Sequence, residues 1–102
     1  MIVELLYFDG CPNVAIARDL LRSALEKQDA AYALHEVEVL NEAEAKDLKF
    51  LGSPSIRING EDVDPLARDD EPFFGCRMYH AGTGLKGQPS LKMIEAAIKR
   101  SS

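Results

Sequence analysis

The chain reads Tyr7-Phe8-Asp9-Gly10-Cys11-Pro12-Asn13-Val14 at the point where an apolar run gives way to a helical pattern. Gly10 allows the turn, and Pro12 suits the first turn of a helix, where a missing N–H loses no partner. Cys11 is therefore expected at the N-terminal end of a helix, where unpaired backbone N–H groups favour thiolate over thiol. We predict a reactive cysteine here. Val14 stands where a C-x-x-C motif would have its second cysteine.

The elements around this stretch follow from hydrophobic periodicity. The nearly continuous apolar run over residues 2–8 is typical of a strand buried on both faces. Helical spacing of apolar residues predicts an amphipathic helix over 14–27, and alternation predicts a half-exposed strand over 31–40. A capping pattern and a later glycine bracket a second helix over about 42–51. The first half is thus βαβ, which calls for a parallel strand pair.

The second half begins with a hairpin signal. Asn59-Gly60 separates the runs Ser55–Ile58 and Glu61–Val63, and this dipeptide supplies the positive φ angles that a two-residue turn needs. A last helix is predicted to begin near Pro89. The predicted order is βαβαββα, in a single domain over 1–102 with a loop insertion at about 64–88.

Composition limits the classes of function. The chain has 102 residues, 46% of them hydrophobic, which suits one modest core. A formal charge of −5 argues against nucleic-acid binding, and no apolar run approaches the roughly 18–20 residues that span a bilayer. The N-terminus resembles a first strand more than a signal peptide. We therefore expect a cytoplasmic protein, a monomer or weak dimer, whose two cysteines stay free or act in chemistry.

The element order, together with Cys11 and the stretch Phe50-Leu51-Gly52-Ser53-Pro54-Ser55-Ile56-Arg57-Ile58-Asn59-Gly60, resembles the thioredoxin-like superfamily, and small glutaredoxin-like proteins in particular. The resemblance covers about 1–63 and 89–100. It implies an α/β fold with a central mixed sheet and helices on both faces. It also implies a cis Ser53–Pro54 bond facing Cys11, with the Ser53 backbone free to pair with an extended substrate. Pro12, Ser53 and Pro54 are then substrate-binding residues.

Cys76, the second cysteine, lies in the part of the chain that the resemblance does not cover. It is a resolving thiol for Cys11, a second ligand for a soft metal ion, or a residue that merely packs over the sheet. Arg77 beside it stabilises a thiolate, holds an anionic ligand such as glutathione, or is simply exposed. No metal site is predicted, and no bound cofactor.

Three functions remain open from the sequence. The first is thiol–disulfide exchange with Cys11 as nucleophile and Cys76 or glutathione as the resolving thiol, acting on a disulfide-containing protein, an oxidised-thiol protein or a small thiol. The second is a thiol protein that binds soft metals, since the chain has two cysteines but no C-x-x-C motif. The third is a redox-inactive binding module. Val14 favours this interpretation, because a redox site that has lost its second cysteine would have another residue at this position.

Overall fold

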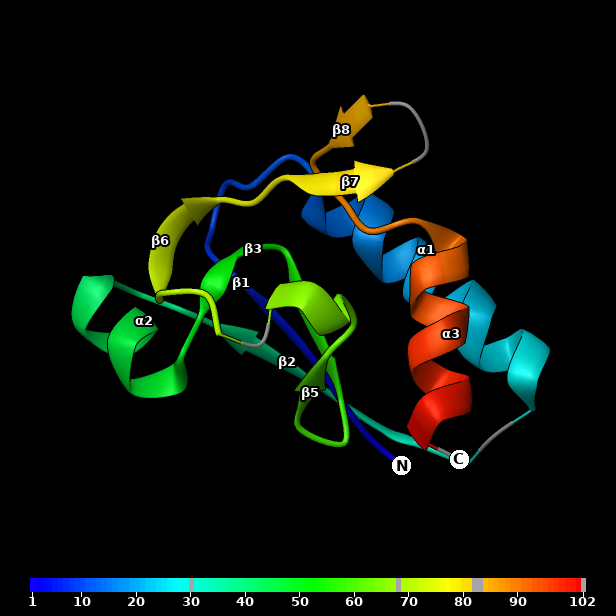
Figure 1. Ribbon diagram of the computed structural model, residues 1–102. Helices are drawn as coiled ribbons and strands as arrows, with labels where there is room; N and C mark the ends of the chain where they lie inside the picture. The colour runs from blue at the N-terminus through cyan, green and yellow to red at the C-terminus, as the bar shows by residue number, and fades with distance from the viewer. Residues whose placement is uncertain (30, 68, 82–83, 102) are drawn as a thin grey trace.

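The computed structural model of the protein describes residues 1–29, 31–67, 69–81 and 84–101. The predicted strand at the N-terminus, the helix after Cys11 and the hairpin across Asn59-Gly60 are present (Figure 1). The elements in chain order are β1 (Ile2–Tyr7), α1 (Val14–Gln28), β2 (Ala33–Glu38), α2 (Glu42–Leu48), β3 (Leu51–Ser53), β4 (Ser55–Ile58), β5 (Glu61–Asp62), the 3₁₀ turn η1 (Pro65–Ala67), β6 (Phe73–Cys76), β7 (Tyr79–Ala81), β8 (Gly84–Lys86) and α3 (Leu91–Ser101).

The main sheet has four strands in the order β2-β1-β4-β5. The predicted parallel pair is confirmed, because β1 runs alongside β2 from Ile2 opposite Ala33 to Tyr7 opposite Glu38. On its other side β1 pairs antiparallel with β4, and β4 continues through the Asn59-Gly60 turn into β5. The sheet is therefore mixed, with β1 in its interior.

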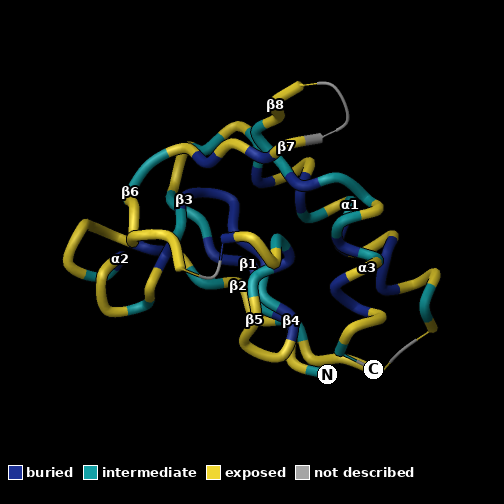
Figure 2. The backbone as a smooth tube through the Cα atoms, in the orientation of Figure 1, coloured by how far each residue is buried: buried dark blue, intermediate teal, exposed yellow. Residues whose placement is uncertain are grey.

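Two hydrophobic clusters cover the two faces of β1. Val3 and Leu5 belong to a cluster with the inner faces of α1 and α3, and Leu6 belongs to a second cluster with Phe50. Because successive side chains of a strand point to opposite faces, one run of apolar residues supplies both clusters. Figure 2 shows the buried backbone concentrated in β1 and in the facing sides of α1 and α3. The N-terminal run is thus buried on both faces, as predicted.

The predicted thioredoxin-like order βαβαββα is wrong. The structure is a small α/β fold in which residues 64–88, expected as a loop insertion, contain η1 and three strands; residues 68, 82 and 83 of this segment lie outside the described part of the chain. Within that segment, β6 pairs with β3 in a separate two-stranded parallel sheet, and β7 forms a hairpin with β8. Strands of three or four residues are too short to give a readable alternation, so the sequence pattern did not reveal them.

The second helix is shorter than predicted. It ends at Leu48 because Lys49 takes the left-handed C-cap conformation at φ 56°, and Gly52 lies in β3 instead of ending the helix. Gly52 has φ 104°, and a Cβ there would lie 2.9 Å from Cβ of Arg77. The glycine is therefore required by a strand that passes close under β6 and the residue after it, not by a helix end.

A pair of glycine substitutions tests this close packing. Gly60→Ala introduces a side chain at φ 84° into open space, so we expect a loss of about 1 kcal/mol in the free energy of unfolding. Gly52→Ala adds the overlap with Arg77 to the same conformational strain, and we expect a loss of about 3 kcal/mol or more. Urea unfolding of both variants measures the difference. Equal losses would show that β3 and the Arg77 segment are not packed as described.

Candidate functional site

Cys11 lies in the connection between β1 and α1. Its backbone N–H donates to the carbonyl of Phe8 at 3.4 Å, which closes a turn, and α1 begins at Val14 with Asn13 as its N-cap. Pro12 is exposed and precedes the N-cap. The Cys11 side chain is partly buried and packs against the edge of the first hydrophobic cluster. The cysteine is therefore held just before the helix start, as expected from its sequence context.

Ser53 is the residue on which the site converges. Its carbonyl oxygen accepts a hydrogen bond from Sγ of Cys11 at 3.7 Å and a second from the backbone N–H of Arg77 at 2.9 Å. Its hydroxyl accepts from the backbone N–H of Phe8 at 3.3 Å. Since Ser53 is fully buried, these contacts fix the position of the Cys11 sulfur relative to β3.

The Ser53–Pro54 peptide bond is cis, as predicted. The carbonyl of Pro54 accepts a hydrogen bond of 2.6 Å from the hydroxyl of Tyr79, a buried residue of β7. The resemblance implies a Ser53 backbone that is free to pair with an extended substrate. Instead, the Ser53 carbonyl is occupied by Arg77, and the protein's own strand β6 runs beside Ser53.

Cys76 lies in the strand that pairs with β3 at Ser53. It is the last residue of β6 and stands in register with Ser53 in the β3–β6 pair. Its side chain is exposed, and both cysteines of the chain are free thiols. The structure therefore brings two cysteines that are far apart in sequence to the same buried residue, one through its sulfur and the other through its backbone.

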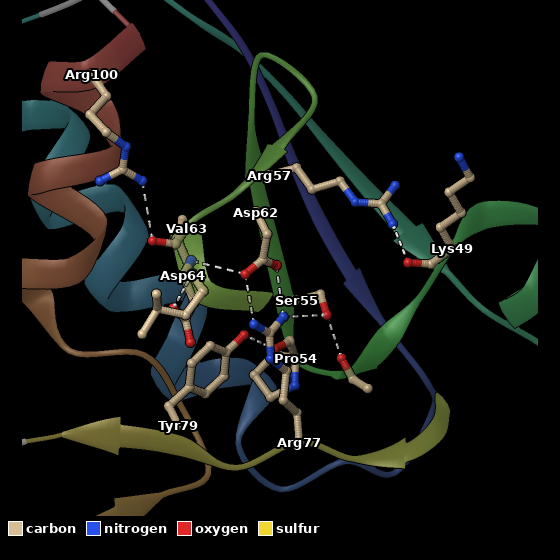
Figure 3. A network of polar contacts seen from close by, with 12 residues as sticks. Lys49, Pro54, Ser55, Arg57, Asp62, Val63, Asp64, Arg77, Tyr79 and Arg100 are labelled. Carbon is tan, nitrogen blue, oxygen red and sulfur yellow. Dashed lines mark hydrogen bonds and ion pairs between the residues drawn. The ribbon is translucent and has the colours of Figure 1, made fainter. Parts of the chain in front are cut away.

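Arg77 is buried and ion-paired, not exposed. Its guanidinium donates to both carboxylate oxygens of Asp62, at 2.8 and 2.7 Å, and to the hydroxyl of Ser55 at 3.0 Å (Figure 3). It also lies 4.2 Å from the ring centre of Tyr79, a cation–π distance. Its positive charge is therefore directed at Asp62, away from the backbone contact that Arg77 makes with Ser53.

The electrostatics of this cluster follow from burial and pairing. Burial alone would lower the pKa of Arg77, but the hydrogen bond to Asp62 and the nearby negative charges outweigh it, and the pKa is raised. Burial also raises the pKa of Tyr79, an effect that the charge of Arg77 only partly offsets. Arg77 thus stays charged and Tyr79 stays a neutral hydrogen-bond donor. The spacing of Asp62, Ser55 and Tyr79 in the sequence gives no indication that they contact Arg77.

The segment after β5 crosses the Cys11 end of the molecule. Phe74 of β6 packs against Phe8 with ring centres 5.5 Å apart, and Gly87 lies so close to Asn13 that a side chain there would overlap it. In Figure 1 the β7–β8 hairpin lies over the start of α1. An open hollow of about 320 Å³ lies beside both cysteine segments, lined by Phe8, Val39, Leu40 and Phe74 and by the acidic residues Asp9 and Glu38.

Comparisons with models of known protein families, with curated proteins and with solved structures found no match. Among the described residues, no helix is both long enough and apolar enough to cross a bilayer. The same part of the chain holds no group of three or more His, Cys, Asp or Glu side chains placed to bind a metal ion.

A double-mutant cycle measures how much the ion pair between Arg77 and Asp62 contributes to the free energy of unfolding. Arg77→Met or Asp62→Leu alone leaves a buried charge without its partner, so each should lower the free energy of unfolding by about 3–5 kcal/mol. The double variant should recover much of that loss, because the uncompensated charge is gone. Urea unfolding provides the measurement.

The matched control is the ion pair Arg18–Glu36, whose side chains are 29% and 30% exposed, against 7% and 8% for Arg77–Asp62. Removing either partner of this control pair should change stability by no more than about 1 kcal/mol. If the two pairs gave similar cycles, the Arg77–Asp62 pair would not be the buried anchor that its contacts indicate.

Proposed function

We propose that this protein carries out thiol–disulfide exchange, with Cys11 as the nucleophile and Cys76 as the resolving thiol. The observation that carries the proposal is the convergence of both cysteines on Ser53. Cys11 is half-buried with its sulfur held by the Ser53 carbonyl, and Cys76 is exposed. The proposal rests on this placement of the two cysteines around Ser53 and not on a shared fold.

The surroundings favour an apolar substrate. Phe73 and Met78, which lie close to Cys76 in the sequence, are 53% and 56% exposed, and the neighbouring hollow is lined largely by apolar side chains. Exposed large apolar residues grouped around a reactive position are typical of a binding surface. We therefore expect the substrate to be a disulfide or oxidised thiol in a protein or small molecule with apolar groups beside its sulfur.

The chemistry takes two exchange steps. The Cys11 thiolate attacks one sulfur of the substrate disulfide, that S–S bond breaks, and the departing sulfur takes up a proton as Cys11 forms a mixed disulfide. The Cys76 thiolate then attacks the Cys11 sulfur, which releases the second substrate thiol and leaves a Cys11–Cys76 disulfide. Two electrons have passed from the protein to the substrate, and a thiol reductant such as glutathione restores both cysteines.

Glutathione is also the alternative to Cys76 in the second step, since an external thiol attacks a mixed disulfide in the same way. Either route requires free thiols at rest, which is the state that the cytoplasm maintains. We accordingly place the activity in the cytoplasm, with glutathione as a co-substrate and no bound cofactor.

Replacing each cysteine in turn should have a different effect on the reaction, so the two variants serve as matched controls for one another. With one equivalent of 2,2′-dithiodipyridine, the unmodified protein should release two thiones per disulfide and form an intrachain disulfide. Cys76→Ser should release one thione and keep the mixed disulfide on Cys11. Cys11→Ser should release thione more slowly than the unmodified protein, because the nucleophile is gone. Absorbance follows the thiones, and mass spectrometry with peptide mapping identifies the products.

Repeating the Cys76→Ser reaction with glutathione separates the two resolving thiols. If glutathione alone releases the second thione, and the unmodified protein never forms an intrachain disulfide, Cys76 is not the resolving residue. If Cys11→Ser reacts as fast as the unmodified protein, Cys11 is not the nucleophile and the proposed function is wrong.

A further inference from the structure

A second cavity, of about 740 Å³, lies apart from the cysteines. It is bounded by the end of α2, the β4–β5 hairpin, the η1 segment and the end of α3, and neither Cys11, Ser53 nor Cys76 lines it. This volume lies within the range of about 300–1,000 Å³ of small-molecule sites. Its apolar lining comes from Leu48, Leu51, Pro65 and Pro72.

Four basic side chains also line this cleft: Lys46, Lys49, Arg57 and Arg100. Arg57 stands opposite Asp62 in the β4–β5 pair, where cross-strand side chains share a face and an ion pair would be expected. The Asp62 carboxylate is instead taken by Arg77. Within the described chain, none of the four basic side chains that line the cleft has a carboxylate partner.

Arg57 is half-buried and held in place without using all its donors. Its Nη2 donates to the carbonyls of Leu48 and Lys49, at 2.6 and 2.9 Å, and these are carbonyls at the end of α2. Figure 3 shows the Arg57 guanidinium reaching the backbone of Lys49, with the Lys49 side chain extending beside it. A guanidinium fixed through one nitrogen, with further N–H groups remaining, is suited to bind an oxyanion.

Acidic residues line other parts of the cleft and restrict what fits. Asp62 is committed to Arg77, and the Asp64 carboxylate accepts from the backbone N–H of Leu66 at 3.0 Å. Glu61, Asp69 and Asp70 are exposed on the lining. These carboxylates would repel a ligand with several negative groups, since like charges brought together in a site are unfavourable.

We propose that this cleft binds a small molecule with one oxyanion group, a carboxylate or a phosphate, on an apolar body. The oxyanion contacts Arg57 and Lys49, and the body packs against Leu48, Leu51 and Pro72. The site is independent of the thiol chemistry proposed for Cys11, because the two share no lining residue.

Titration of the ¹⁵N-labelled full chain, followed by NMR, tests the site with probes that share one alkyl body. Hexanoate or hexyl phosphate should shift the amides of residues 48–51 and 60–64 in a saturable way, and the tighter of the two identifies the oxyanion. Hexanol and hexylammonium should bind at least roughly ten-fold more weakly, since they lack the charge-assisted contact. Equal binding of hexanoate, hexyl phosphate and hexanol, or no saturable shift, would overturn the proposal.

Variants locate the charge that matters. Arg57→Gln should weaken binding of the favoured oxyanion by roughly ten-fold or more. Lys49→Gln should weaken it less while keeping the bonds of Arg57 to α2, so it guards against a folding defect in the first variant. Lys92→Gln, which changes an exposed lysine of α3 outside the cleft, is the matched control.

An equal loss of affinity in Lys92→Gln, or none in Arg57→Gln, would show that binding depends on overall charge or lies elsewhere. Cys11→Ser should bind the probe as the unmodified protein does. This result separates a failure of the cleft from a failure of the proposed thiol activity.

Discussion

The buried ion pair between Arg77 and Asp62 is the interaction on which the arrangement of this protein depends. It joins the segment after β5 to the main sheet, and it is surrounded by the hydroxyl of Ser55 and the ring of Tyr79. A buried charge is strongly unfavourable unless it is paired and hydrogen-bonded, so the segment has little freedom to settle elsewhere. In the described part of the chain, no buried side-chain nitrogen or oxygen lacks a hydrogen-bond partner. The pair thereby fixes β6, and with it Cys76, beside Ser53.

The same pair also sets the charges at both candidate sites. The guanidinium of Arg77 bonds to Asp62, whereas the backbone N–H of Arg77 bonds to the residue that holds the Cys11 sulfur. Because Asp62 is used by Arg77, its cross-strand neighbour Arg57 has no carboxylate partner among the residues that the structure describes. The partner of this one carboxylate therefore affects both sites. The Arg77 guanidinium is held at Asp62, and Arg57 in the cleft keeps N–H groups that no described carboxylate accepts.

Local patterns predicted the elements that depend on local physics. The run over residues 2–8 predicts a strand buried on both faces, because its apolar residues belong to both hydrophobic clusters. Asn59-Gly60 predicts a turn, because both residues take positive φ. The sequence could not predict β6, whose four residues are held by pairing with a distant three-residue strand. Nor could it place Arg77, since the partner of a charged residue is decided by tertiary contacts. Gly52 was misassigned for the same reason: its role comes from Arg77 lying above it.

Net charge and local charge lead to different conclusions about ligands. The formal charge of −5 produces a field that disfavours polyanions, but between exposed charges that field is largely screened beyond about 8–10 Å at moderate salt. A hydrogen bond from a fixed guanidinium acts at about 3 Å and in a partly desolvated site, where screening is weak. The overall charge therefore opposes a polyanion, whereas the fixed guanidinium still suits a ligand with a single oxyanion. The distinction depends on the position of Arg57 and not on the number of basic residues.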